Sequence, residues 1–106
     1  MKDRIKELRR VPIELIEDNP DNFRIHPTQQ RNALRLALEK VGFVNPLIVY
    51  ETEGGKYRLI DGHLRKELVG QGDVPVIVLD VRDDEEALAI LASIDPIAAL
   101  ADFDTI

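Results

Sequence analysis

Residues 57–68 read YRLIDGHLRKEL, and this stretch decides the expected fold and the expected site. Its first four residues predict a strand, Asp61 and Gly62 predict a turn, and Leu64 and Leu68 have the spacing of a helix that faces a core. At the start of such a helix, exposed backbone N–H groups and the positive end of the helix dipole favour an anion. The stretch therefore predicts a phosphate or carboxylate site where a strand turns into a helix.

The side chains at this turn suit a phosphate. Gly62 leaves the backbone open to a ligand, His63 can donate or accept a hydrogen bond near neutral pH, and Arg65 can bind two phosphate oxygens at once. Asp61 is expected to cap the helix and is also a candidate metal ligand. Four residues make a weak motif, so spacing alone favours a simple turn in which Arg65 pairs with Glu67 or Asp61.

The segments around this stretch predict a small sheet. Residues 47–50 read LIVY and are followed by a Glu-Gly-Gly turn, so they should form a hairpin with residues 57–60. Residues 74–79 read VPVIVL, and an apolar run of this kind is typical of a strand buried on both faces. A further short strand is expected over residues 11–16, where a proline confines it to an edge.

A long helix is expected from Pro27 or Thr28 to Val41, and Gly42 should end it. Its apolar stripe, at helical spacing, consists of Leu34, Ala37, Leu38 and Val41. The other side of this helix should face solvent and carries Arg31, Arg35 and Glu39.

A second well-defined helix is expected over residues 83–94. Asp83 and Glu86 have the spacing of a capping box there, and Ala87, Ile90, Leu91 and Ile94 form its apolar stripe. The acidic residues at its start suit the helix dipole better than a metal site. An Asp-Pro pair then starts another short helix over residues 97–103.

Length and pattern together predict an α/β (α+β) fold. The 106 residues suit one small domain, which we place at residues 11–95, with a small mixed sheet and packed helices. Residues 1–10 are expected to be a charged, solvated lead-in. Residues 96–106 are expected to be a C-terminal helical segment, and its apolar character suggests that the parent protein continues.

The amino-acid composition excludes several kinds of site. The chain has no cysteine, which excludes disulfides, thiolate metal sites and thiol catalysis. It has three Phe, two Tyr and no Trp, too few for the aromatic platform of a single-strand nucleic-acid binder. No apolar run approaches the length needed to span a membrane, so we expect a cytoplasmic protein with no membrane partner.

Charge is unevenly distributed along the chain. The net charge is −6, but residues 1–40 carry nine Lys or Arg against seven Asp or Glu, whereas residues 41–106 carry five against thirteen. The acidic part should not be attracted to a phosphate backbone, so DNA is a disfavoured partner for this domain alone. A single nucleotide needs only a local positive pocket, and the net charge does not forbid it.

Five segments, taken together and in this order, resemble the ParB/sulfiredoxin-like domain family: VPI at 11–13, NFRIH at 22–26, NPLIV at 45–49, IDGHLR at 60–65 and VPVIV at 74–78. They span nearly the whole chain, and the joint match is much more specific than any single motif. The resemblance implies a compact α/β domain in which the helix that begins at the glycine of IDGHLR binds phosphate.

The branches of this family differ at the same motif. Known members are CTP-hydrolysing partition proteins, sulfiredoxins that use ATP, free-serine kinases and domains described as nucleases. Sulfiredoxins have Gly-Cys-His-Arg there, so His63 takes the place of their cysteine and their chemistry is not expected. Partition proteins have Gly-Glu-Arg-Arg, so only Gly62 and Arg65 carry over. The motif is more similar to ParB-like domains that occur alone or ahead of a DNA methyltransferase module.

The resemblance also implies that a loop with Asn22, Arg24 and His26 approaches the phosphate helix. Arg24 would add a cation for a polyphosphate, and His26 would orient a group or a water. The alternative is that Asn22 closes a turn and both basic side chains are solvated. The implied ligand is a nucleoside triphosphate, CTP or ATP, with Mg. The implied binding residues are Asn22, Arg24, Gly62, His63, Leu64 and Arg65.

Three functions are compatible with these residues. The first is a ParB-like phosphate- or nucleotide-binding domain, with weak NTPase activity, in a DNA-associated bacterial or phage protein. The second is a nuclease or phosphotransferase in which His63 or His26 serves as the catalytic acid or base. The third is a non-catalytic interaction module that forms a homodimer or docks onto a downstream domain.

Overall fold

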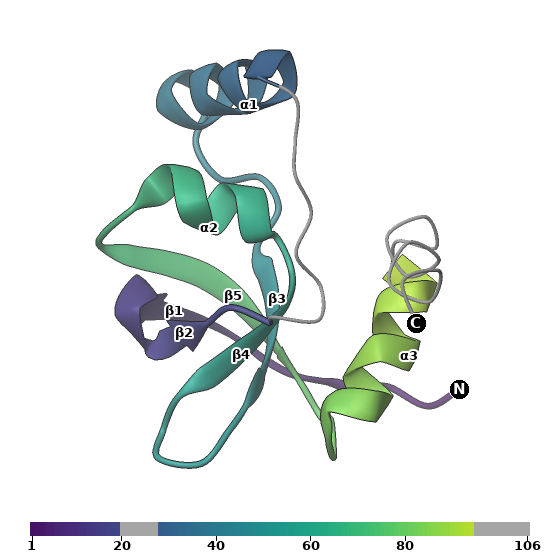
Figure 1. The fold of residues 1–106 in the computed structure, drawn as a ribbon. Helices are drawn as coiled ribbons and strands as arrows, with labels where there is room; N and C mark the ends of the chain where they lie inside the picture. Colours follow the sequence, from purple (N-terminus) through teal and green to yellow (C-terminus); the bar gives the residue numbers. More distant parts are fainter. Residues whose placement is uncertain (20–27, 95–106) are drawn as a thin grey trace.

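The computed structural model describes residues 1–19 and 28–94. Within these residues the chain forms a five-stranded sheet, three α-helices and a short 3-10 helix (Figure 1). In chain order the elements are β1 (Ile5–Pro12), the 3-10 helix (Ile13–Leu15), β2 (Ile16–Glu17), α1 (Thr28–Lys40), β3 (Leu47–Glu51), β4 (Tyr57–Asp61), α2 (His63–Val69), β5 (Asp73–Leu79) and α3 (Asp84–Ile94). The predicted α/β fold with a small mixed sheet is confirmed.

The sheet has the strand order β1-β5-β3-β4-β2 and mixes parallel and antiparallel pairs. β3 and β4 form the predicted antiparallel hairpin, and Thr52 N donates a 2.9 Å hydrogen bond to Lys56 O across its turn. β5 runs parallel to β3 and antiparallel to β1, while β2 runs parallel to β4. Because β5 lies inside the sheet and contributes to the core on both faces, it has the apolar sequence of an internal strand.

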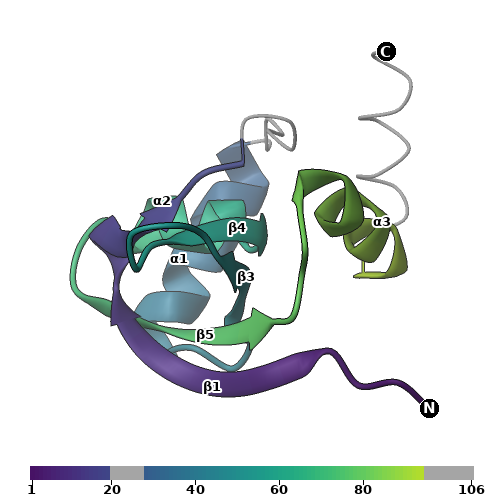
Figure 2. The same cartoon turned by 90° about the horizontal axis from the view of Figure 1, so that it is seen from below.

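The two faces of the sheet have separate cores, because successive side chains of a strand point to opposite faces. We call the larger one the α2 face, since Val69 of α2 packs against it; its buried residues are Val11, Ile13, Ile16, Leu47, Val49, Tyr57, Leu59, Val74, Val76 and Val78. We call the smaller one the α3 face; its buried residues are Tyr50, Ile60, Leu79, Ala87 and Leu91. Figures 1 and 2 show α3 well separated from α1 and α2.

The N-terminal lead-in that the sequence predicted is a strand instead. Ile5–Pro12 pairs antiparallel with β5 as an edge strand, from Ile5 opposite Leu79 to Pro12 opposite Asp73. Residues 5–10 are exposed, so no apolar alternation marks them in the sequence. The backbone pairing, and not burial of side chains, therefore makes this segment a strand.

The strand that the sequence predicted over residues 11–16 is also wrong. Only Val11 and Pro12 belong to β1, and the chain then makes the 3-10 helix before the two-residue β2 begins at Ile16. Pro12 has φ −59° and ψ 135°, and its ring restricts φ to this region. Val11, Ile13 and Ile16 are buried in the α2 face, so the apolar pattern comes from a turn that faces the core.

α1 begins at Thr28, one of the two predicted starts, and ends at Lys40, one residue before the predicted end at Val41. Its apolar stripe is only half covered. None of its described side chains is buried; Leu34 and Leu38 are half-buried, and Val41 beyond its end is 72% exposed. Arg31, which was expected to face solvent, makes a bidentate ion pair with Glu67 of α2 at 2.9 and 3.2 Å. That ion pair raises the pKa of Arg31, and it joins α1 to α2 at a distance from the sheet.

α3 has the predicted capping residue, and Glu86 in its first turn makes two ion pairs. Asp83 Oδ1 accepts a 2.8 Å hydrogen bond from Glu86 N, and the stripe residues Ala87 and Leu91 are buried. Glu86 also pairs with Arg4 beside β1 at 2.6 Å and with Arg82 at 2.7 Å. The hydrogen bond from Arg4, followed by those from Arg82, lowers the pKa of Glu86 to about 2.

The predicted helix over residues 97–103 lies outside the described residues. Among the residues that are described, none of the helices has both the length and the apolar character needed to cross a membrane.

Candidate functional site

The turn between β4 and α2 requires glycine for two separate reasons. Gly62 has φ 107° and ψ 23°, a left-handed conformation that side chains disfavour. A Cβ at this position would also lie 2.5 Å from Leu47 Cδ2 and 3.0 Å from Arg65 Nη2. The backbone at Gly62 is therefore closely flanked by an apolar side chain of β3 and by a guanidinium group.

Asp61 does not cap α2, contrary to the prediction. It is the last residue of β4 and pairs with Ile48 of β3, while Gly62 occupies the N-cap position without any side-chain hydrogen bond. The strand thus extends one residue further than the sequence indicated. Backbone N–H groups in the first turn of a helix have no acceptor within the helix. In α2 the N-cap residue provides no side-chain acceptor for them either.

Arg65 is held over this turn by a backbone carbonyl group. Its Nη2 donates a 3.3 Å hydrogen bond to Pro46 O, and it makes no ion pair with any described acidic residue. Its Nε is buried and has no partner among the described residues. The alternative in which Arg65 pairs with Glu67 or Asp61 is wrong, because Arg65 donates to Pro46 O instead and Glu67 pairs with Arg31.

The other two residues of the motif have different surroundings. His63 is the first residue of α2, so it lies at the helix start as predicted. Its side chain is half-buried. Leu64 is only 7% exposed, which leaves its backbone N–H group as the part that can meet a ligand. The proposed catalytic role of His63 stays a prediction.

The beginning of the predicted polar loop lies next to α2. Lys66 Nζ of α2 donates to Asp18 Oδ1 at 3.0 Å, and the Lys66 side chain is only 19% exposed. Asp18 directly follows β2, which runs parallel to β4. Asn22, Arg24 and His26 lie outside the described residues, so their roles stay predictions.

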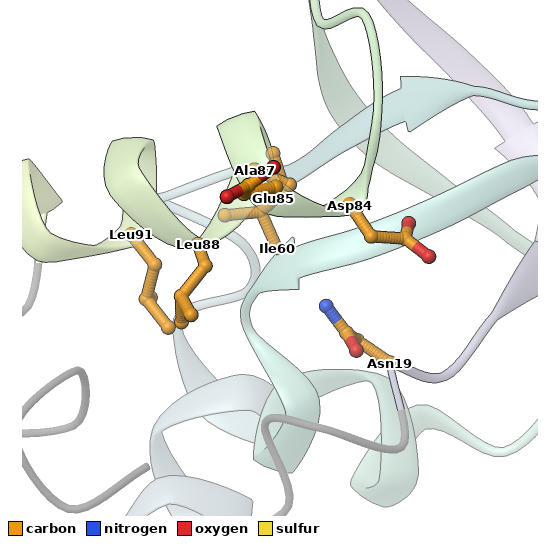
Figure 3. Close-up of a pocket in the computed structure, with 7 residues that line it drawn as sticks. All are labelled: Asn19, Ile60, Asp84, Glu85, Ala87, Leu88 and Leu91. Atoms are coloured by element: carbon orange, nitrogen blue, oxygen red, sulfur yellow. The ribbon is translucent and has the colours of Figure 1, made fainter. Parts of the chain in front are cut away.

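A small pocket lies between β4, α3 and Asn19, which is two residues beyond β2 (Figure 3). Ile60, two residues before Gly62, lies in it together with the apolar side chains of α3. Its polar lining is Asn19, Asp84 and Glu85, and its volume is about 140 Å³. Sequence reasoning missed this pocket, since its lining comes from three separate segments.

No cluster of three or more potential metal ligands occurs among the described residues. Asp61, the predicted metal ligand, is therefore not part of such a cluster among the described residues.

Comparison with known proteins decides which family the chain belongs to. The family model described as ParB N-terminal domain matches residues 2–94, which is most of the chain. The chain belongs to the ParB N-terminal domain family. The predicted resemblance is thereby confirmed, and the family match includes β1, which the sequence reading had left outside the domain.

Two relatives show what this ParB N-terminal domain is similar to. It is 30% identical over 90 residues to the nucleoid occlusion protein of Geobacillus sp. (strain WCH70), a match that covers 81% of this chain and 32% of that protein. It superimposes with a TM-score of 0.73, at 26% identity, on the C-terminally truncated chromosome-partitioning protein ParB from Caulobacter crescentus complexed with CTP-gamma-S. That match covers 86% of this chain and 53% of the other. The chain thus spans a third to a half of these relatives.

Two further structures bear on the expectations for this ParB N-terminal domain. Sulfiredoxin from Arabidopsis thaliana matches with a TM-score of 0.62 at 19% identity, over 80% of this chain and 96% of the other, which shows a shared fold alone. The same Caulobacter crescentus ParB, complexed to the centromeric parS site, matches at 26% identity with a TM-score of 0.61, over 77% of this chain and 43% of that chain. The comparisons therefore do not support the expectation that DNA is a disfavoured partner.

Proposed function

We propose that this domain binds a nucleoside triphosphate, with CTP as the first candidate, at the turn formed by Gly62 and Arg65. It would do so as the N-terminal part of a DNA-associated protein of the partition or nucleoid-occlusion type. The observation that carries the proposal is the arginine itself. Arg65 lies close to the backbone of Gly62, has a buried Nε without a described partner, and is not neutralised by a described acid.

An anion fits this arrangement better than any other ligand class. A half-buried guanidinium without a carboxylate partner attracts negative charge, and the first N–H groups of α2 point in the same direction as the helix dipole. The absence of a Cβ at Gly62 lets the Arg65 guanidinium and the Leu47 side chain lie close to the backbone at the start of α2. The relative that is complexed with CTP-gamma-S supports the choice of CTP over other anions.

Within the proposal each residue has a binding role. Arg65 would contact phosphate oxygens while Pro46 O keeps its guanidinium in place. The N–H groups of His63 and Leu64 would donate to the same phosphates, and the loop with Arg24 would add a second cation. A triphosphate binds together with Mg²⁺, which would neutralise part of its charge. Weak NTPase activity stays a prediction.

Titration calorimetry with CTP, ATP, GTP and UTP, each with magnesium, tests the proposal. We expect the wild-type chain to bind CTP, and Arg65→Ala to bind it about 10- to 100-fold more weakly, since a hydrogen bond to a charged group contributes about 1.5–3 kcal/mol. Arg65→Lys keeps the charge and should lie between the two. Arg10→Ala removes an exposed arginine of β1 and is the matched control.

Two outcomes would contradict this function. One is a wild-type chain that binds none of the four nucleotides at millimolar concentration. The other is a folded Arg65→Ala variant, checked by circular dichroism, that binds CTP as the Arg10→Ala control does. Measuring phosphate release in the same samples tests the NTPase prediction separately.

A further inference from the structure

α2 carries a second cation, Lys66, whose side chain is unusually enclosed for a lysine. It is 19% exposed, whereas Lys6 and Lys56, which also form ion pairs, are 48% and 53% exposed. Its Nζ donates to Asp18 Oδ1 at 3.0 Å. An ammonium group that has lost much of its water needs a negative partner, and Asp18 is that partner in the free protein.

Lys66 and Arg65 lie on opposite sides of the turn at Gly62. β4, which leads into this turn, lies between β3 and β2 in the sheet. Arg65 donates to Pro46 O directly before β3, whereas Lys66 donates to Asp18 directly after β2. Lys66 N also donates to Gly62 O at 3.0 Å, so Lys66 is one helical turn beyond the glycine. Because helical side chains lean toward the N-terminus of their helix, that of Lys66 is directed back toward this turn.

The two cations have different partners in the free protein. Arg65 donates to a neutral carbonyl group, whereas Lys66 is paired with a carboxylate. The Asp18 side chain is 67% exposed, and an ion pair with so exposed a carboxylate contributes little to stability. A triphosphate carries more negative charge than a carboxylate and can replace Asp18 on the ammonium group.

We propose that Lys66 is a second phosphate-binding residue of this site, and that Asp18 pairs with its ammonium group until the nucleotide binds. The inference rests on the proposed function. A phosphate oxygen takes the place of Asp18 Oδ1 on Lys66 Nζ, while Arg65 contacts the phosphates from the β3 side. The carboxylate of Asp18 then returns to solvent. Asp18 therefore competes with the ligand, and only an anion of high charge, such as a polyphosphate, displaces it readily.

Removing the two partners of this ion pair should have opposite effects on CTP affinity. Lys66→Met keeps the aliphatic stem and removes the charge, and we expect about tenfold weaker binding. Asp18→Asn removes the competing charge, and we expect binding about two- to fivefold tighter than in the wild type. If the ion pair only held the fold together, Asp18→Asn would weaken binding as Lys66→Met does. Lys66→Arg should keep most of the affinity.

The ion pair between Lys6 and Glu51 provides matched controls. Lys6→Met and Glu51→Gln change the net charge by the same amounts, at a pair that joins β1 to β3 and does not involve α2. Both should bind CTP as the wild type does. The proposal would be overturned if Lys66→Met matched Lys6→Met, if Asp18→Asn bound more weakly than the wild type, or if Glu51→Gln reproduced the gain of Asp18→Asn.

A double-mutant cycle tests the exchange itself. The gain from Asp18→Asn should disappear in the Lys66→Met background, because Asp18 acts only by occupying Lys66. A gain that persisted without Lys66 would show that Asp18 repels the ligand directly, and the exchange would be refuted. Circular dichroism and urea midpoints confirm that each variant is folded under the conditions of the titration.

Titration with inorganic tripolyphosphate separates this inference from the function on which it rests. It carries the phosphates without a base, and the variants should follow the same order as with CTP. A wild type that bound tripolyphosphate but no nucleotide would refute the proposed function, and the role of Lys66 would stand if that order held. A wild type that bound CTP while Lys66→Met bound it equally well would refute the role of Lys66 alone. Binding of neither ligand would overturn both.

Discussion

The α2 face and the α3 face of the sheet are stabilised by different forces. On the α2 face the aliphatic side chains Leu47, Val49, Leu59, Val76 and Val78 are fully buried. The α3 face has fewer buried residues, and the first turn of α3 is attached by ion pairs through Asp84 and Glu86. Burial of apolar area does not depend on protonation, whereas ion pairs are weakened when their acids are protonated and are screened by salt. The two faces should therefore respond differently to the same perturbation.

The candidate site lies where these two faces meet. Gly62 contacts Leu47 of the α2 face, whereas Ile60 and Asp84 belong to the α3 side of the sheet. The candidate site is therefore bounded by apolar packing on one side and by ion pairs on the other. Three predictions, from the largest expected effect to the smallest, separate the contribution of apolar burial from that of the ion pairs.

The largest effect is expected from a cavity in the α2 face. Leu59→Ala removes a fully buried side chain in the middle of the sheet, and we expect it to lower the free energy of unfolding by about 2–5 kcal/mol. Leu91→Ala on α3 should cost less, because half-buried neighbours such as Leu88 can move toward the gap. Urea unfolding of both variants measures the difference.

The slopes of those unfolding curves provide the control. Both variants should keep the wild-type dependence on urea, which shows that the same surface is exposed on unfolding. A Leu91→Ala variant as unstable as Leu59→Ala would show that the two faces contribute equally, and the distinction between them would be lost.

The next effect is expected at the turn itself. Gly62→Ala must adopt φ 107° and must also push against Leu47, so we expect a loss of stability toward the upper end of roughly 1–3 kcal/mol, together with loss of CTP binding. Gly54→Ala is a matched control, since Gly54 has φ 82° but nothing within 4 Å of the added Cβ. Thermal unfolding of both variants separates backbone strain from the steric clash. Equal losses would mean that the close approach of Leu47 has no energetic role.

Sequence reasoning succeeded where side chains are sorted by burial. The β3–β4 hairpin, β5 and α3 all carry an apolar pattern, and each was predicted close to its observed bounds. β1 was missed because its exposed residues bear no such pattern. The opposite happened at α1, where an apolar stripe is present in the sequence but the fold covers only part of it.

Sequence patterns predicted only those residues of the site that lie close together in the chain. Gly62 and Arg65 follow from the strand-to-helix motif, but the partner of Arg65 is a carbonyl group 19 residues away. The contact between Lys66 and Asp18 spans 48 residues, and no spacing rule predicts a pair so distant. Asp61 was misassigned because one additional ladder pair, with Ile48, extends β4 and moves the cap to the next residue.

The smallest expected effect is a loss of stability at acidic pH, and it is specific to the α3 face. Glu86 has a pKa of about 2 in the folded protein against an ordinary value of 4.5, because Arg4 donates a hydrogen bond to it. A lowered pKa means that the paired carboxylate stabilises the fold above pH 4.5 and that this stability is lost as the pH falls toward 2. Glu86→Gln should therefore be less stable than the wild type at pH 7, and the gap should close as the pH falls from about 4.5 to about 2.

Urea midpoints of the wild type and Glu86→Gln, measured from pH 7 to pH 2, test this dependence. Glu85→Gln removes the same charge from the same helical turn without any described contact to Arg4, so it controls for the helix dipole. Its gap at pH 7 should be smaller than that of Glu86→Gln. Hydrogen exchange should show faster exchange in α3 than in β5 at low pH, because acid weakens the ion pairs and leaves the aliphatic core intact. A gap for Glu86→Gln that stays constant with pH would show that α3 is held by its apolar contacts alone, and the contrast between the two faces would then be one of size only.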